Sequence, residues 1–154
     1  MKAIIFMVLA VLCSTSHFSL LAQEHQHHHE QQDAELVLNH GEKWSIDASL
    51  HLGMTRIKDD LKQNLDLIHY DKFTHEQFNS LALKLDRHLS FLFENCKLEP
   101  KADAQLHILL ARIMSGVDTM KHADNKKPGA VAIIKALQDY PKYFNDANWQ
   151  PIVH

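Results

Sequence analysis

The sequence predicts an all-α protein, an up-down-up-down antiparallel four-helix bundle that follows a disordered N-terminal leader. Apolar residues recur at steps of three and four along four segments, as they do on one face of a helix. The connections between these segments are short and contain Pro, Gly, Asp and Asn. The residues before them are polar, rich in histidine and without periodicity, which is typical of a disordered segment.

The N-terminus has the pattern of a secretory signal peptide. Lys2 precedes an apolar block over residues 3–12 that is too short to cross a bilayer, and Ala22 offers a small residue at a cleavage site. We therefore expect a mature chain that starts near Gln23 and is exported through the Sec pathway to the periplasm, without membrane insertion. A lipoprotein is the alternative, but Cys13 does not follow the small residue that its signal requires.

These features divide the chain into a signal peptide (1–22), a histidine-rich disordered leader (23–39) and a four-helix bundle domain (40–154). Removal of Lys2 with the signal leaves fifteen basic and nineteen acidic residues, a net charge of about −4 with neutral histidine. No basic stripe remains that could neutralise phosphates, so we expect no nucleic-acid partner.

The ends of the first three helices carry recognisable signals. Ser45 or Asp47 suits the first turn of the first helix, which residues 70–72 end. Thr74 begins a capping-box pattern for the second helix, which runs to about residue 95. Pro100 suits the first turn of the third helix.

The fourth helix follows a loop that composition predicts at residues 124–129, and Pro141 must kink or end it. Each helix has one apolar face that we expect in the core. In chain order the four faces are Ile46, Leu50, Met54, Ile57, Leu61, Leu65 and Ile68; Phe78, Leu81, Leu85, His88 and Leu92; Leu106, Leu109 or Leu110, Ile113, Val117 and Met120; and Val131, Ile134, Leu137 and Phe144.

Counting outward from the loops places several histidines at one level of the bundle. Residues equally far from a short hairpin loop lie at the same height, which pairs His88 with His107 and sets Met54 and His51 within about a turn or two of them. Imidazole and thioether are ligands that copper accepts, and imidazole alone also suits zinc. The sequence therefore predicts a metal site at His51, Met54, His88 and His107, built from facing helices.

The leader adds four more imidazoles in a five-residue stretch. Because that stretch has no fixed geometry, we expect it to capture metal loosely and with little selectivity. These residues are His25, His27, His28 and His29. Together with the bundle histidines they favour a periplasmic protein that buffers, delivers or senses copper or zinc, in exchange with a periplasmic or membrane metal-handling protein.

Two other functions stay open at this point. Met54 and a histidine could hold haem b from both sides, which would make an electron-transfer protein, although the absence of a CxxCH motif excludes covalent haem. A cofactor-free interaction module is the second alternative, because no strict metal-binding motif is present. No catalytic constellation, phosphate loop or nucleophile elbow is found, so we do not expect an enzyme.

Cys96 is the single cysteine left after signal removal, so it cannot form an internal disulfide. It is then a buried thiol, a metal ligand or a bridge between two copies of the chain. A bridge would make the protein a homodimer.

Several short stretches resemble a family of small exported proteins of proteobacteria called DnrO-like. They are "HGEKW" at 40–44, "GM" at 53–54, "CKLEPKADAQLH" at 96–107, "GVDTMK" at 116–121 and "YFNDANW" at 143–149. The resemblance covers nearly the whole expected mature domain, and it implies a periplasmic helical bundle. It implies no specific function.

A second resemblance is to soluble b-type cytochromes with four-helix bundles. "MTRIKDDLK" at 54–62 is similar to the stretch around their methionine ligand on the first helix. The histidine ligand of their fourth helix has no counterpart, because residues 143–145 read Tyr-Phe-Asn and the nearest histidine is His154. Haem would therefore need His88 or His107 instead.

Overall fold

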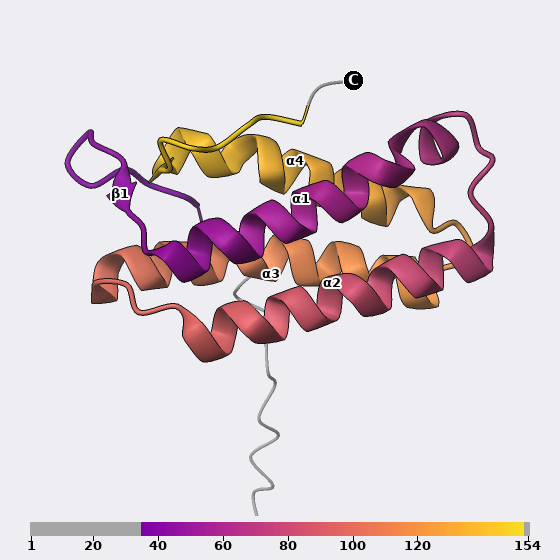
Figure 1. Cartoon of the computed structure of the whole chain (residues 1–154), viewed down its shortest axis with the longest axis horizontal. Helices are drawn as coiled ribbons and strands as arrows, with labels where there is room; N and C mark the ends of the chain where they lie inside the picture. The colour runs from indigo at the N-terminus through magenta and orange to yellow at the C-terminus, as the bar shows by residue number, and fades with distance from the viewer. Residues whose placement is uncertain (1–34, 153–154) are drawn as a thin grey trace, which may run out of the picture.

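The computed structural model describes residues 35–152, so the expected signal peptide and the four leader histidines lie outside the described residues. The predicted four-helix bundle is confirmed, with each helix packed against the next one in the chain (Figure 1). Two short strands accompany the helices. The elements are β1 (Trp44–Ser45), α1 (Ala48–His69), α2 (His75–Asn95), α3 (Pro100–His122), α4 (Lys127–Tyr143) and β2 (Phe144–Asn145). Within residues 35–152, no helix has the length and apolarity to cross a membrane.

The predicted signals at the helix starts are confirmed. Asp47 caps α1 by accepting the Leu50 amide at 2.7 Å, and Thr74 and Gln77 form a complete capping box at α2. These bonds satisfy amide groups that have no partner inside the helix. Pro100 is the first residue of α3, where its missing amide hydrogen costs nothing.

The loop between α3 and α4 is shorter than composition predicts, and two lysines at the start of α4 cap the ends of other helices. The ammonium of Lys126 donates to the Lys121 carbonyl at 2.6 Å, and that of Lys127 donates to the His69 carbonyl at 2.9 Å. Both carbonyls belong to last turns of helices, α3 and α1, where carbonyls have no intrahelical partner. A cation at this end also suits the helix dipole.

The predicted core faces of α1 and α3 are buried, except for Ile46, which precedes α1 and is only partly buried; both Leu109 and Leu110 contribute to the core. Two predicted faces need correction. On α2, Leu89 is buried where His88 was expected, and His88 lies at the edge of the helix contact. On α4, Val131 is exposed and Ile134 only partly buried, because the buried face is rotated to Gly129, Ala130, Ile133, Ala136, Leu137 and Tyr140. Small residues decide this rotation.

Gly116 on α3 and Gly129 on α4 allow the two backbones to approach closely. A Cβ atom at Gly129 would lie 2.4 Å from the Gly116 carbonyl oxygen, and one at Gly116 would lie 2.7 Å from the Gly129 carbonyl oxygen. Contacts this short are not tolerated, so the α3–α4 contact requires glycine at both positions. A search for apolar periodicity overlooks such positions, because glycine is not counted as a core residue.

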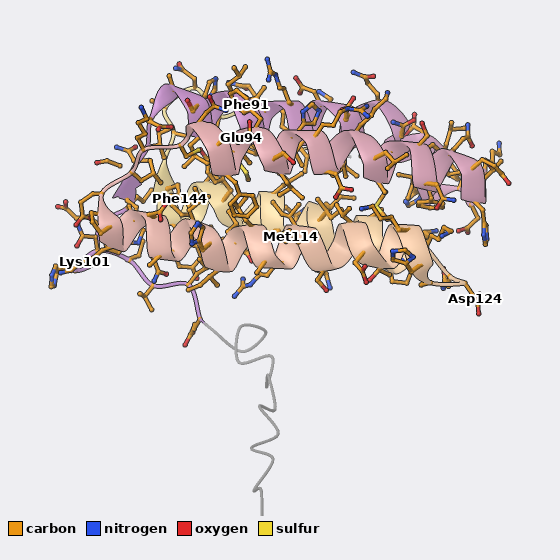
Figure 2. All side chains as sticks on the ribbon, turned by 90° about the horizontal axis from the view of Figure 1, so that it is seen from below. Phe91, Glu94, Lys101, Met114, Asp124 and Phe144 are labelled. Carbon is orange, nitrogen blue, oxygen red and sulfur yellow. The ribbon has the colours of Figure 1, made fainter. Side chains whose placement is uncertain are left out.

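The segments that precede α1 and follow α4 are joined by a parallel strand pair that the periodicity does not predict. Trp44 of β1 pairs with Phe144 of β2, and Phe144 is fully buried and stacks on Tyr140 with ring centroids 5.4 Å apart. Leu36 is also buried in the core, so packing begins before residue 40, where the bundle domain was expected to start. Figure 2 shows Phe144 among the side chains between the helices.

Candidate functional site

A polar cluster of His51, Tyr140 and Asp146 lies where α1 begins and α4 has just ended. The His51 Nδ1 atom lies 2.8 Å from Oδ2 and 3.0 Å from Oδ1 of Asp146. The Tyr140 hydroxyl donates to Asp146 Oδ2 at 3.1 Å, and the Asn148 backbone amide donates to Oδ1 at 3.2 Å. Both carboxylate oxygens are therefore occupied by donors, as a buried carboxylate requires.

The three members of the cluster differ in how much water reaches them. The Asp146 side chain is 2 % exposed and that of His51 is 34 % exposed, while Tyr140 is fully buried. Burial, assisted by the Asp146 charge, holds the pKa of the Tyr140 hydroxyl well above its ordinary value. The hydroxyl is thus a permanent donor to Asp146 at physiological pH.

The imidazole of His51 offers one nitrogen to a ligand. Its Nδ1 atom is occupied by Asp146, and within residues 35–152 its Nε2 atom has no hydrogen-bond partner. One third of the side chain is open to solvent. An imidazole whose first nitrogen is held by a carboxylate and whose second is free has the arrangement of a typical metal-ligating histidine.

Cys96 and Asp47 lie at the same end of the bundle. The second carboxylate oxygen of Asp47 accepts the Lys97 amide at 2.6 Å, which joins the start of α1 to the end of α2. Cys96 is a free, partly buried thiol, and burial together with the charges of Asp47 and Asp103 raises its pKa to about 12. A thiol that keeps its proton is a poor nucleophile and a poor metal ligand.

His88 is paired with a different carboxylate. Its Nε2 atom lies 2.8 Å from Oδ2 of Asp60, and both side chains are about one fifth exposed, at 21 % and 20 %. Asp60 is nine residues after His51 on α1, which is about 14 Å along the axis and half a turn around it. His51 and the His88–Asp60 pair therefore face opposite sides of α1.

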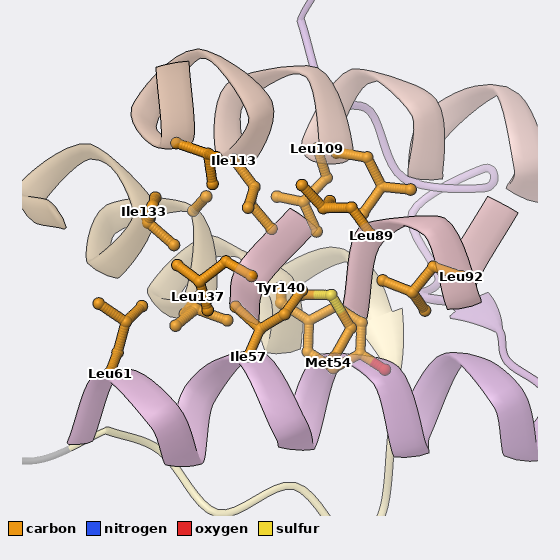
Figure 3. Packing of buried hydrophobic residues seen from close by; sticks show 14 of the residues in the cluster. Met54, Ile57, Leu61, Leu89, Leu92, Leu109, Ile113, Ile133, Leu137 and Tyr140 are labelled. Atoms are coloured by element: carbon orange, nitrogen blue, oxygen red, sulfur yellow. The ribbon is translucent and has the colours of Figure 1, made fainter. Parts of the chain in front are cut away.

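The remaining members of the predicted bundle site are also separate. His107 is half exposed and has Asp103 on its own helix as its carboxylate partner, at 3.8 Å. Met54 is fully buried in the core cluster that contains Ile57 and Tyr140 (Figure 3). Counting residues from the loops gives the position of a residue along the bundle axis, but it does not give the direction of its side chain.

The structure thus gives His51, His88 and His107 three different carboxylate partners, Asp146, Asp60 and Asp103. Among residues 35–152, no three His, Cys, Asp or Glu side chains form a group that could hold a metal ion by themselves. Haem ligation by Met54 would require the core around it to open, because this side chain has no exposed surface. The metal and haem assignments stay predictions.

Asp146 and Tyr140 are the residues that sequence reasoning missed. Tyr140 lies on the rotated face of α4, and Asp146 follows the last helix, where apolar periodicity gives no information. The stretch "YFNDANW", which contains Asp146, has no metal-ligand spacing that would single this residue out. Comparisons with protein-family models, curated proteins and solved structures found no match to this chain.

Proposed function

We propose that this chain is a periplasmic transition-metal-binding protein that buffers, delivers or senses copper or zinc. The observation that carries the proposal is the orientation of His51, whose Nδ1 atom is held by the nearly buried Asp146 and whose Nε2 atom has no hydrogen-bond partner within residues 35–152. In metal sites, a carboxylate on the far nitrogen of a histidine orients the ring and makes it a better ligand.

Charge supports the same assignment. Asp146 carries a negative charge next to the imidazole, and its other partners are neutral: the Tyr140 hydroxyl and the Asn148 amide. A cation bound at the Nε2 atom of His51 would be attracted by the negative charge of Asp146. The favourable interaction is strengthened by burial of the carboxylate, since solvent screens it little.

One imidazole does not hold a metal ion tightly, so other ligands must complete the site. The leader histidines are the candidates, because the sequence gathers four of them within five positions. His29 is seven residues before Leu36, the first buried residue, and seven residues of extended chain span up to about 25 Å. We propose that the leader histidines supply these ligands, which requires them to reach the end of the bundle where His51 lies.

The ligand types determine which metals suit the site. Without the sulfur of Met54, which is buried in the core, the available ligands are imidazoles, and imidazole suits zinc and copper(II) alike. The thioether that would favour copper(I) is absent from this set. Zinc is therefore the first probe to use.

The test is competition between the chain from residue 23 and a chromogenic zinc chelator at neutral pH. We expect His51→Ala, and separately the fourfold replacement of His25, His27, His28 and His29 by alanine, to weaken zinc binding at least tenfold. Binding should also weaken at pH 5, because a protonated imidazole cannot ligate. His122→Ala is the matched control, since His122 is an exposed histidine with its own carboxylate, Asp118.

Two outcomes would contradict the proposal. In the first, the chelator keeps all of its zinc in the presence of the protein, and a copper chelator keeps all of its copper. The protein would then bind neither metal tightly enough to compete. A wild-type affinity that falls equally in His51→Ala and His122→Ala would mean that His51 has no special part in it.

A further inference from the structure

The carboxylate of Asp146 restricts the neutral imidazole of His51 to one tautomer. A carboxylate only accepts hydrogen bonds, so the Nδ1 atom, 2.8 Å from Oδ2, must carry the hydrogen. In the neutral ring the Nε2 atom then has a free electron pair. The opposite tautomer would place the Nδ1 electron pair against a carboxylate, which is repulsive.

Asp146 is itself held in place from two sides. The Tyr140 hydroxyl donates to Oδ2 from the last turns of α4, and the Asn148 amide donates to Oδ1 from the segment after β2. The Trp149 ring packs edge-on against Tyr140, with centroids 4.7 Å apart, so Tyr140 cannot easily turn away. With 2 % of its side chain exposed, Asp146 also has almost no water that could replace these donors.

In the His88–Asp60 pair the carboxylate binds the other ring nitrogen. In His88 the Nε2 atom meets Asp60, so the hydrogen lies on Nε2 and the free electron pair on Nδ1. A neutral histidine in water favours the hydrogen on Nε2. His88 therefore keeps the ordinary form, whereas His51 is driven into the less common one.

We propose that Asp146 and Tyr140 are positioning residues, which hold His51 as the Nδ1–H tautomer so that Nε2 is the atom presented to a ligand. The tautomer of His51 follows from the geometry alone. The role of the exposed Nε2 atom as a ligand rests on the proposed metal binding. It also makes the C-terminal segment part of the site, because the residues that orient His51 come from α4 and from the turn after β2.

The test has a spectroscopic part that needs no metal. Two-bond nitrogen–proton spectra of the ¹⁵N-labelled chain from residue 23, recorded above pH 8, distinguish the tautomers of each histidine. We expect His51 as Nδ1–H and His88 as Nε2–H. Asp146→Asn should shift His51 toward Nε2–H, because an amide can donate as well as accept, while Asp60→Asn should leave His51 unchanged. Nε2–H as the main form of wild-type His51 would overturn the inference.

The second part is zinc affinity, measured as in the preceding section. Asp146→Asn should weaken zinc binding about ten- to a hundredfold, and Asp60→Asn should change it by less than twofold. Tyr140→Phe keeps Asp146 but removes one donor, so it should lie between them, and it serves if Asp146→Asn loses its helical circular dichroism.

The two proposals fail in different ways. Nδ1–H in His51 without zinc or copper binding supports the positioning role and rejects the metal function. Zinc binding that needs His51 but is unaffected by both Asp146→Asn and Tyr140→Phe supports the metal function and rejects the positioning role.

Discussion

Two histidine–aspartate pairs in this protein have the same shortest nitrogen–oxygen distance, 2.8 Å, but different surroundings. The His51–Asp146 pair joins α1 to the segment after β2, and its carboxylate is 2 % exposed with two further donors. The His88–Asp60 pair joins α1 to α2, and both of its side chains are about one fifth exposed.

The difference shows that distance alone does not define the role of such a pair. Water can replace either partner of His88–Asp60, so that pair fastens two helices that the core already holds together. Asp146 is almost inaccessible to water, so a donor that is removed from its buried carboxylate is not readily replaced. Only the His51 pair favours the less common tautomer of its imidazole, with the hydrogen on Nδ1.

The largest expected effect of this closed environment is on Cys96, at the same end of the bundle. Its thiol pKa of about 12 lies above the ordinary value of 9.0, so at pH 8 the folded chain should react with iodoacetamide on the order of a hundredfold more slowly than the urea-unfolded chain. A raised pKa stabilises the folded state below about pH 9, and this stabilisation is lost as the pH rises toward 12. Equal rates in both states would show that water reaches this end freely.

The next effect is on stability and compares the two carboxylates directly. Asp146→Ala should lower the free energy of unfolding by about 3 kcal/mol, because it leaves the buried Tyr140 hydroxyl without an acceptor and also removes the bond to His51. Asp60→Ala should cost about 1 kcal/mol or less, since its pair is partly solvated. Urea titrations at pH 7 measure both values. Equal losses would remove the distinction between the pairs.

A smaller effect isolates the contribution of the tyrosine. Tyr140→Phe should cost about 1 to 2 kcal/mol, because Asp146 loses one of its donors while the ring still packs on Phe144 and Trp149. Tyr143→Phe is the control in the same helix; its hydroxyl has no hydrogen bond within residues 35–152, so the cost should stay below about 0.5 kcal/mol. Thermal unfolding followed by circular dichroism compares the two. A Tyr140→Phe protein as stable as Tyr143→Phe would mean that Asp146 does not need this donor.

The sequence by itself determined the four helices, their order and most of their ends. Asp47, Thr74 and Pro100 act on the few residues next to them, so their effect is independent of the rest of the fold. The apolar faces of α1 and α3 were also determined locally, because a long face with many large residues tolerates only one orientation.

Only the tertiary structure decided the faces of α2 and α4 and the partner of each histidine. Leu89 took the core position expected for His88, and the glycine contact rotated α4 so that Tyr140 points inward. His51 meets Asp146 across 95 positions of sequence, through a turn outside the helices. Apolar periodicity gives the position of a residue along its helix axis and the approximate direction of its side chain around that axis. A hydrogen bond depends on the position of a second segment to within a fraction of an ångström.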